Sequence, residues 1–440
     1  MPAFVRTRLA GRHGLQRALD NSIWLFADQL FRMGLALITG VWIARYLGPD
    51  RYGWFSYATA AVGMLTSLTS LGLNAVVVRD MVRGPADANM LMGSAFGIRL
   101  IGALISLAAC IVLTSVRVPQ VEAVSVLLVV LAVGMVCQTF DVIDLMFQAK
   151  GQPRISAWIR IFGCSIASAI KIVLILWKAP LEAFAVASAA EQAINSVCWL
   201  WASARRGWYV SAWHWSLVFV RRLLRESWPL AIAGVAIYAQ AYTDQLVIGS
   251  MLSANELGQY AAAMRLVTVF SFIPMVICTV AAPEITRAKQ QDEALYRQRL
   301  FGIYRLMFAF FLAIAVPLAL VGPPLTRLLY GAPFAEAANL LPWLALRLFF
   351  TNFGVARSAF LTNEGLFGFS LVTAVAGAVA NIALNFVLVR PFGPIGAIIS
   401  SVVSFTITTF ALEVFEPRAR VNLRLMLWAI VCPLRRTAPG

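Results

Sequence analysis

Charged side chains are scarce in this 440-residue chain. Asp, Glu, Lys and Arg make up only 13% of the residues, whereas about 25% is usual for soluble domains. Hydrophobic residues make up 60%, and the mean hydropathy is +0.79. This composition excludes an ordinary soluble protein and indicates a chain that lies largely in lipid.

Several motifs are absent as well, and each absence excludes a class of chemistry. No G-x-x-x-x-G-K-[ST] motif occurs, so we expect no direct ATP hydrolysis. His13 and His214 both fall outside the apolar segments, which leaves no histidine relay or zinc site within them. The six cysteines lie in apolar stretches without a C-x-x-C spacing, which is typical of small buried hydrophobic residues. We therefore expect no enzymatic activity, no catalytic residues, no metal and no cofactor.

The apolar residues form blocks of about 20 to 28 residues that are separated by short polar segments. About 20 apolar residues allow a helix to cross the hydrocarbon core, and a helix satisfies its own backbone hydrogen bonds in lipid. The blocks therefore predict an all-α integral membrane protein with twelve transmembrane helices. The predicted spans are 20–46, 53–78, 90–115, 122–148, 154–177, 181–204, 226–251, 257–283, 299–322, 338–361, 366–389 and 394–415.

Two terminal segments need separate interpretation. The first apolar block is too long for a secretory signal and contains Asp28 and Arg32, so we expect a retained first helix. The stretch at 421–436 is apolar but bounded by arginines, which predicts an interfacial helix. A short thirteenth span is the alternative for this stretch.

Lys and Arg are unevenly distributed among the connections between the predicted spans. With the N-terminus inside, about 22 of them lie on the inner side and about six on the outer side, which predicts cytoplasmic termini. This asymmetry and contact with anionic lipid headgroups explain the net charge of +16. No basic soluble region is present to bind nucleic acid. The expected regions are a basic cytoplasmic N-terminus (1–19), an N-lobe of spans 1–6 (20–204), a cytoplasmic linker (205–225), a C-lobe of spans 7–12 (226–415) and a basic amphipathic cytoplasmic tail (416–440).

One turn sequence occurs twice in the chain. The segments "IARYLGPDRYGWFSYATA" (43–60) and "IGSMLSANELGQYAAA" (248–263) match at several positions, among them Gly53 and Gly258. Six predicted crossings separate the two turns, so both lie on the same side of the membrane. Such a parallel repeat predicts two six-helix lobes that are related by an axis along the membrane normal.

Three stretches carry a resemblance to a known family. They are "ARYLGPDRYGWFSYA" (44–58), "LGLNAVVVRD" (71–80) and "YTDQLVIGSMLSANELGQYAAAMRL" (242–266). Together with the twelve-span plan, they resemble bacterial polysaccharide-biosynthesis membrane proteins. This family includes the O-antigen and exopolysaccharide flippases of the multidrug/oligosaccharidyl-lipid/polysaccharide exporter superfamily. The resemblance covers nearly all of the chain but does not identify the sugar.

The resemblance implies two parallel six-helix lobes around a central cavity and a function in the bacterial inner membrane. Members of the family move an undecaprenyl-pyrophosphate-linked oligosaccharide from the inner to the outer leaflet by alternating access. The implied partners are this lipid-linked glycan and, as a further candidate, a glycan polymerase of the same pathway. Two rival functions remain open: a related exporter of drugs or of the peptidoglycan lipid precursor, and a membrane glycan polymerase or ligase.

Cations within the predicted spans are the candidate substrate-binding residues. A charge at the centre of a membrane helix costs roughly 2.5–3.5 kcal/mol on insertion scales, so charges kept there indicate function. Guanidinium groups bind phosphate oxygens bidentately, which suits a cavity that accepts a pyrophosphate. The candidates are Arg32, Arg99, Arg160, Lys171, Arg265 and Arg347. Instead of lining the cavity, Arg32 could pair with Asp28 one turn away. A further arginine within a span, Arg357, could extend its side chain to the lipid headgroups.

The acids within the spans are candidates for ion coupling or for gating pairs. They are Asp28, Asp144 and Asp244. Asp144 has the simpler alternative of neutralising nearby basic residues. Asp244 has no cation beside it in sequence, so it either senses a proton or sodium ion or pairs with an arginine across the lobe interface. We hypothesise that Asp28 or Asp244 couples transport to an ion gradient. Asn381 and Asn385, one turn apart, are expected to hydrogen-bond between helices.

Overall fold

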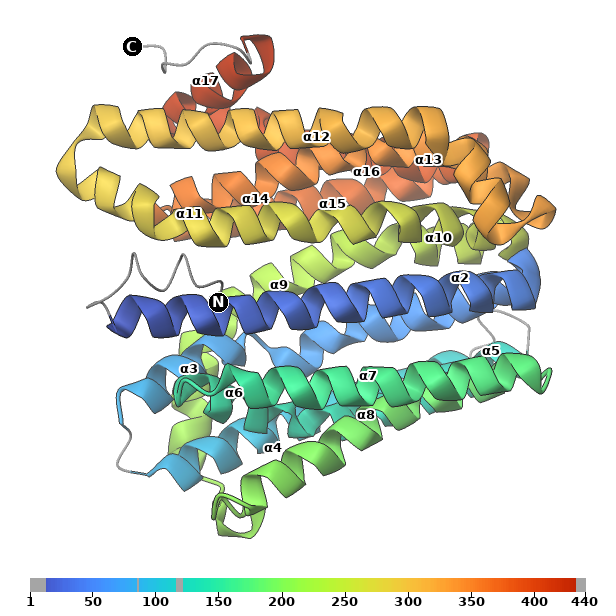
Figure 1. Ribbon diagram of the computed structural model, residues 1–440, viewed down its shortest axis with the longest axis horizontal. Helices are drawn as coiled ribbons and strands as arrows, with labels where there is room; N and C mark the ends of the chain where they lie inside the picture. The colour runs from blue at the N-terminus through green and yellow to red at the C-terminus, as the bar shows by residue number, and fades with distance from the viewer. Residues whose placement is uncertain (1–12, 85–86, 116–121, 433–440) are drawn as a thin grey trace. The chain divides into compact units, whose positions relative to one another are not determined.

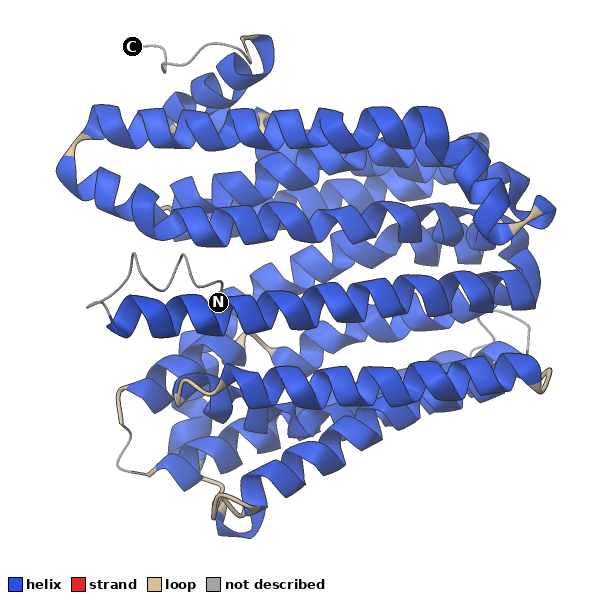
Figure 2. Cartoon of the chain, viewed as in Figure 1, coloured by secondary structure: helices blue, strands red, loops and turns tan. Residues whose placement is uncertain are grey.

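The computed structural model describes residues 13–84, 87–115 and 122–432. Every regular element within these residues is a helix (Figure 2), so the all-α prediction is confirmed. The α-helices are α2 (His13–Ser70), α3 (Leu73–Val82), α4 (Ala88–Ser115), α5 (Glu122–Gln138), α6 (Val142–Ala149), α7 (Pro153–Leu176), α8 (Leu181–Ala204), α9 (Leu217–Met251), α10 (Ala254–Thr268), α11 (Phe272–Gln291), α12 (Glu293–Tyr330), α13 (Ala335–Ala345), α14 (Arg347–Asn363), α15 (Phe367–Phe392), α16 (Pro394–Thr409) and α17 (Pro417–Val431). The 3-10 helices are η1 (Thr139–Asp141), η2 (Val210–Ala212), η3 (Val269–Ser271), η4 (Ala332–Phe334) and η5 (Ala411–Val414).

Within the described residues, 9 helical segments are long and apolar enough to cross a membrane. The first of them, Phe26–Val82, contains two of the predicted spans, because α2 kinks at Gly48. The candidates thus contain ten of the twelve predicted spans. The other two predicted spans correspond to α8 and α9, which are helical as expected.

Two of the predicted spans contain a 3-10 turn between two α-helices. The span at 122–148 is built from α5 and α6 with η1 between them, and the span at 257–283 from α10 and α11 with η3 between them. A short 3-10 turn within a helix changes the direction of the chain and exposes backbone groups, so it often marks a hinge. In the first case the interruption lies just before Asp144 and so helps to position this carboxylate.

The chain divides into two compact units. Unit 1 contains the described residues up to Ile43 together with Ala61–Gly234, and unit 2 contains Ala44–Ala60 together with Val235 onwards. The division between the units therefore falls twice inside α2 and once inside α9. The lobe boundaries predicted from the sequence stay a prediction. Of the basic N-terminus, residues 1–12 lie outside the described residues, as do residues 433–440 of the tail.

Each unit has its own cluster of buried apolar side chains. In unit 1, Val77, Leu91 and Phe147 are fully buried and bring α3, α4 and α6 together. In unit 2, Phe301 and Phe353 do the same for α12 and α14. Helices of one unit thus pack through shared apolar side chains.

The two copies of the repeated turn pack against each other within unit 2. The first copy begins at the kink of α2, where Gly48 has φ of 72° and is followed by Pro49. A Cβ on Gly53 would lie 1.9 Å from the carbonyl oxygen of Ala254, and a Cβ on Gly258 would lie 2.0 Å from that of Pro49. The two contacts are equivalent under the repeat, as in an isologous two-fold interface. No side chain fits at either position, so both glycines are required.

A polar contact joins the same two turns. Asn255 donates from Nδ2 to Asp50 Oδ2 at 3.2 Å, and these two residues are 205 positions apart. Beside them, Ser253 is the N-cap of α10 and forms a capping box, in which Glu256 N donates to Ser253 Oγ and Ser253 N donates to the Glu256 carboxylate. The repeated sequence therefore has a structural reason, since each copy of the turn is the packing surface of the other.

The helix α17 lies on unit 2 and is too short to be a thirteenth span. Its 15 residues extend about 22 Å, which is less than the hydrocarbon thickness of about 30 Å. Buried residues recur along one face, and Asn422 on this face accepts a hydrogen bond from the hydroxyl of Tyr304 on α12 at 2.6 Å. The opposite face exposes arginines and Trp428, as an interfacial helix requires.

Candidate functional site

Two buried aspartates and two partly exposed arginines meet inside unit 1. The helix α2 supplies Asp28 and Arg32, α6 supplies Asp144, and α7 supplies Arg160. Arg32 donates from Nε to Asp28 Oδ1 at 2.7 Å, and Arg160 Nη1 lies 3.8 Å from Asp28 Oδ2. Arg160 also donates to Asp144. We call these four residues the four-charge cluster, in which Asp28 joins two arginines and Arg160 joins two aspartates.

Two glutamines add hydrogen bonds to this cluster, although Asp144 Oδ1 has no hydrogen-bond partner. Gln29 accepts from Arg32 Nη2 at 2.8 Å, and Gln148 donates from Nε2 to Asp144 Oδ2 at 2.8 Å. Both glutamines lie within one turn of the charged residue that they contact, so helix geometry alone brings these partners together. The contact between α6 and α7 depends instead on the short connection between these helices.

The carboxylates of the cluster are buried, whereas its guanidinium groups reach the surface. The side chains of Asp28 and Asp144 are 2% and 6% exposed, and those of Arg32 and Arg160 are 30% and 29% exposed. A guanidinium presents its donors in a planar fork, so a carboxylate on one edge orients the other edge. With both aspartates ionised the cluster is neutral, and an incoming anion would compete with the carboxylates for the arginines.

An aromatic pair lies one helical turn before Asp28. The ring centroids of Trp24 and Trp158 are 6.0 Å apart with an interplanar angle of 44°. The guanidinium carbon of Arg154 lies 5.1 Å from the centroid of the Trp24 ring. Sequence reasoning missed this group, although Trp24 precedes Asp28 by one turn and Trp158 lies close to Arg160 in sequence. Indole rings of this kind stack on apolar faces of ligands or anchor helices at the membrane interface.

The other two predicted cations of unit 1 have partners of their own. Arg99 on α4 is 7% exposed and donates to Asn74, while its Nε has no hydrogen-bond partner. Lys171 on α7 lies 3.4 Å from Glu191 Oε2 on α8. Of the four cations predicted in this unit, the structure therefore brings Arg32 and Arg160 together.

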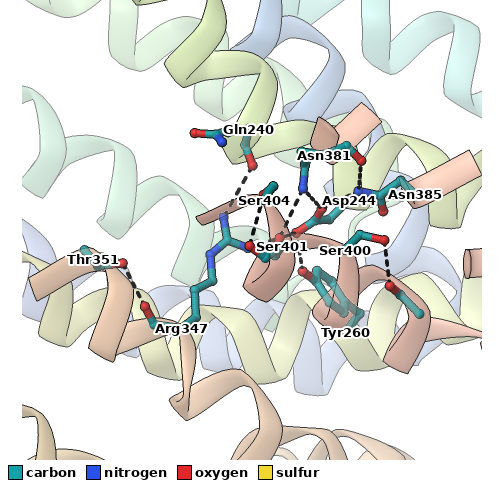
Figure 3. Close-up of polar contacts among 11 residues, drawn as sticks. Gln240, Asp244, Tyr260, Arg347, Thr351, Asn381, Asn385, Ser400, Ser401 and Ser404 are labelled. Carbon is teal, nitrogen blue, oxygen red and sulfur yellow. Dashed lines mark hydrogen bonds and ion pairs between the residues drawn. The ribbon is translucent and has the colours of Figure 1, made fainter. Parts of the chain in front are cut away.

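In unit 2, the carboxylate of Asp244 is surrounded by hydrogen-bond donors (Figure 3). It lies on α9 and is 1% exposed. The donors come from α10, α14, α15 and α16, so this one carboxylate joins five helices. They are Ser401 Oγ at 2.5 Å, Tyr260 Oη at 2.9 Å, Arg347 Nη1 at 2.9 Å, Asn385 Nδ2 at 3.0 Å and Asn381 Nδ2 at 3.4 Å.

Arg347 neutralises Asp244 within the same unit. Its side chain is 10% exposed, its Nη2 donates to the carbonyl oxygen of Gln240 at 3.4 Å, and its guanidinium carbon lies 5.2 Å from the centroid of the Phe405 ring. Of the two alternatives for Asp244, the structure shows a pair with an arginine, but inside unit 2. Asn381 and Asn385 connect helices, as expected, and their Oδ1 atoms have no hydrogen-bond partner.

Two further arginines of unit 2 lie elsewhere. Arg265 on α10 donates from Nη1 to the hydroxyl of Tyr52 at 3.5 Å, beside the repeated turn. Arg357 on α14 is 5% exposed, and its Nε lies 2.6 Å from Oε1 of the fully buried Glu413. The interpretation that Arg357 extends to the lipid headgroups is therefore wrong, because a buried carboxylate holds it inside the unit.

Comparison with known proteins agrees with this architecture. The family model described as polysaccharide biosynthesis protein matches residues 18–289. The probable low-salt glycan biosynthesis flippase Agl15 of Haloferax volcanii is 22% identical over 194 residues. This match covers 43% of the chain and 40% of the relative, so it spans less than half of either protein.

Solved structures of two transporters share the fold. An inward-facing multidrug resistance MATE family transporter of the MOP superfamily has a TM-score of 0.70 at 16% identity, with 94% of this chain and 98% of that chain covered. The lipid II flippase MurJ, in an inward closed conformation, has a TM-score of 0.74 at 12% identity, with 94% and 91% covered. Identities this low show the fold alone. Because the family model matches more than half of the residues, the chain belongs to the polysaccharide biosynthesis protein family and has the fold of these membrane transporters.

Proposed function

We propose that the protein is a flippase for a lipid-linked oligosaccharide. Its substrate would be an undecaprenyl-pyrophosphate-linked O-antigen or exopolysaccharide repeat unit, moved from the inner to the outer leaflet of the bacterial cytoplasmic membrane. Membership of the polysaccharide biosynthesis protein family supports this function, as does the description of the relative from Haloferax volcanii as a glycan biosynthesis flippase. The observation that carries the proposal is the four-charge cluster, with two partly exposed guanidinium groups on buried carboxylates.

The cluster suggests how a pyrophosphate is bound and released. Arg32 and Arg160 would bind phosphate oxygens through the edges of their guanidinium groups that Asp28 and Asp144 do not occupy. The two carboxylates compete for the same donors, which keeps the arginines from binding the anion irreversibly. Loading would loosen the contacts with the aspartates, and the return of these contacts would promote release. No bond is made or broken in the substrate, so the proposed activity is transport without catalysis.

The remaining predicted cations have more distant roles in this proposal. Lys171 and Arg347 are paired with Glu191 and Asp244, so they would serve as gating pairs, whereas Arg99 and Arg265 would add positive potential along the transport path. Alternating access would expose the path first to the cytoplasm and then to the outside. A glycan polymerase of the same pathway would receive the product.

Coupling to an ion gradient is proposed for one of two aspartates. Asp28 shares its carboxylate between two partly exposed arginines, whereas Asp244 is buried beneath five donors. Separate Asp28→Asn and Asp244→Asn variants should be assayed for transport with and without an uncoupler. Coupling predicts that one variant loses its response to the uncoupler. An unchanged response in both, with transport intact, would reject coupling through either residue.

The proposed topology has both termini in the cytoplasm. The basic residues of the α11–α12 connection and of α17 then lie on the cytoplasmic side, in agreement with the positive-inside rule. Single cysteines placed at Gln290 and at Asp50 would test this orientation in a background without other accessible cysteines. A membrane-impermeant thiol reagent should label the second position in intact cells and the first only after lysis.

Export of drugs or of the peptidoglycan lipid precursor is the second candidate. The fold likeness to a multidrug resistance MATE transporter and to the lipid II flippase MurJ favours this class. The two candidates differ in which compound accumulates when the protein is absent. A glycan polymerase or ligase, the rival of another class, differs from both in the leaflet that holds the accumulated glycan.

The deciding experiment is an inventory of the lipid-linked glycans of a deletion strain, resolved by leaflet. A complete repeat unit trapped on the cytoplasmic face would support the flippase. Complete but unpolymerised units on the outer face would support a polymerase or ligase instead. Normal glycans combined with increased drug sensitivity, or with trapped peptidoglycan precursor, would support the second candidate.

A further inference from the structure

A groove of about 890 Å³ separates α11 from α12 in unit 2. Volumes of 300–1,000 Å³ are usual for sites of small molecules. One wall is a stripe of α11 that includes Val276, Val280 and Glu284, and the other is a stripe of α12 that includes Arg299 and Leu306. The spacing within each stripe is that of one helix face, so two facing surfaces of a helical hairpin remain apart along the groove.

The helices α11 and α12 form a hairpin (Figure 1). One residue, Asp292, separates the end of α11 from the start of α12, and its backbone is extended with φ of −158°. Gly302 on α12 lines the floor of the groove, and an added Cβ at this position would meet no atom within 4 Å. Val280 and Leu306 remain 58% and 48% exposed, so the walls offer apolar surface that the described residues leave uncovered.

Charge is confined to the end of the groove near the connection between the two helices. Glu284 and Arg299 face each other there with 3.7 Å between Oε2 and Nη1, and their side chains are 60% and 54% exposed. An ion pair this long and this exposed is weak. A phosphate can therefore replace the Glu284 carboxylate as the partner of the Arg299 guanidinium. The exposed Arg287, one turn further along α11, adds positive potential.

The length of the groove matches one leaflet of a bilayer. Its wall on α11 runs from Val276 to Ile285, which corresponds to about 14 Å of helix. This is about half of the 30 Å hydrocarbon core. A molecule with an anionic head at Arg299 and acyl chains directed toward Val276 and Leu306 fits these dimensions.

We propose that this groove is a binding site for one anionic phospholipid of the leaflet that faces the α11–α12 connection. The phosphate lies on Arg299, and an acyl chain fills the space above Gly302 between the two helices. The site differs in residues and in unit from the four-charge cluster, so it does not depend on the transported substrate.

Native mass spectrometry of the full-length protein, purified in detergent and titrated with palmitoyl-oleoyl phosphatidylglycerol, tests the proposal. The wild type should bind one phosphatidylglycerol with clear preference over phosphatidylcholine. Gly302→Leu fills the floor of the groove, and Val280→Trp fills it from the opposite wall. We expect each to weaken binding about tenfold, and Arg299→Ala to weaken it by a similar factor and to remove the preference for the anionic lipid.

Matched controls separate the groove from general effects. Gly368→Leu adds the same side chain where an added Cβ also meets open space, and Arg424→Ala removes another exposed arginine. Both should bind like the wild type, and all variants should elute as single monodisperse species. Unchanged binding in Gly302→Leu and Val280→Trp would overturn the proposal. Displacement of phosphatidylglycerol by equimolar undecaprenyl phosphate would also overturn it, since the groove would then belong to the substrate's chain.

Discussion

The pair formed by Asp244 and Arg347 is expected to respond asymmetrically to the loss of either charge. Removal of one partner of a buried ion pair typically costs about 3–5 kcal/mol, because the other charge is left without compensation. Here the two charges have different surroundings. Asp244 keeps four uncharged donors when the guanidinium is lost, whereas Arg347 keeps the Gln240 carbonyl at 3.4 Å and the Phe405 ring when the carboxylate is lost.

These surroundings predict an order of stability among the variants. Arg347→Met should lower the free energy of unfolding by about 3 kcal/mol, since the remaining donors stabilise the carboxylate. Asp244→Asn should lower it by about 5 kcal/mol, since a buried guanidinium is left nearly unsolvated. The double variant has no buried charge, so it should be no less stable than Arg347→Met. The coupling free energy between the two positions should then be at least about 5 kcal/mol.

Denaturant unfolding of the purified protein in detergent, followed by helical circular dichroism, would give these free energies. Glu293→Gln and Arg297→Met form a matched control pair, because this ion pair of 3.3 Å is exposed on α12 and should show a coupling below about 1 kcal/mol. Additive costs for Asp244→Asn and Arg347→Met, within about 0.5 kcal/mol, would refute the reasoning. A larger cost for Arg347→Met than for Asp244→Asn would refute the assigned roles of the neutral donors.

Three further predictions concern the repeated turn, the four-charge cluster and the tail helix. Gly258→Leu should destabilise the protein by about 2 kcal/mol or more, because its side chain would overlap the backbone at Pro49. The control Gly368→Leu should change thermal stability little, since an added Cβ meets open space there. Equal effects of the two substitutions would contradict the packing of the two turns. Arg160→Ala should reduce glycan transport more than Arg160→Lys at equal protein levels; equal losses would indicate a role of charge alone, and no loss would remove this residue from the site. Asn422→Leu removes the hydrogen bonds from Nδ2 to Glu413 at 3.0 and 3.1 Å. Amide hydrogen exchange in residues 417–431 should therefore accelerate. Unchanged exchange would show that apolar packing alone holds α17 in place.

The helical architecture could be predicted from the sequence because lipid imposes a strong pattern on composition. Apolar blocks predicted a helix at every predicted span, including α8 and α9, although these two are not among the segments apolar enough to cross a membrane. The interruptions at η1 and η3 escaped prediction, since each is only three residues long and lies inside a longer apolar block. Such turns depend on packing between helices and leave little trace in hydropathy.

The contacts of the candidate site were predictable only where helix geometry creates them. Asp28 and Arg32 are four residues apart on one helix, so their pairing was one of the two alternatives considered. Arg160 reaches Asp28 from a helix far along the chain, and Arg347 reaches Asp244 across 103 residues. The sequence identified these residues as charges within apolar segments, but it carried no information about which helices become neighbours.

The repeat also shows which features the two halves do not share. In the 205-residue register of the turns, Asp28 and Arg32 correspond to Ala233 and Ile237, and Asp244 corresponds to Thr39. The turn that packs on its own copy is thus repeated, whereas the charges of the first and seventh predicted spans are not. Packing between the copies requires the same backbone on both sides, and this constraint acts equally on the two halves. A partly exposed cluster in unit 1 and a fully buried carboxylate in unit 2 instead meet different physical demands, so the two units are expected to contribute differently to transport.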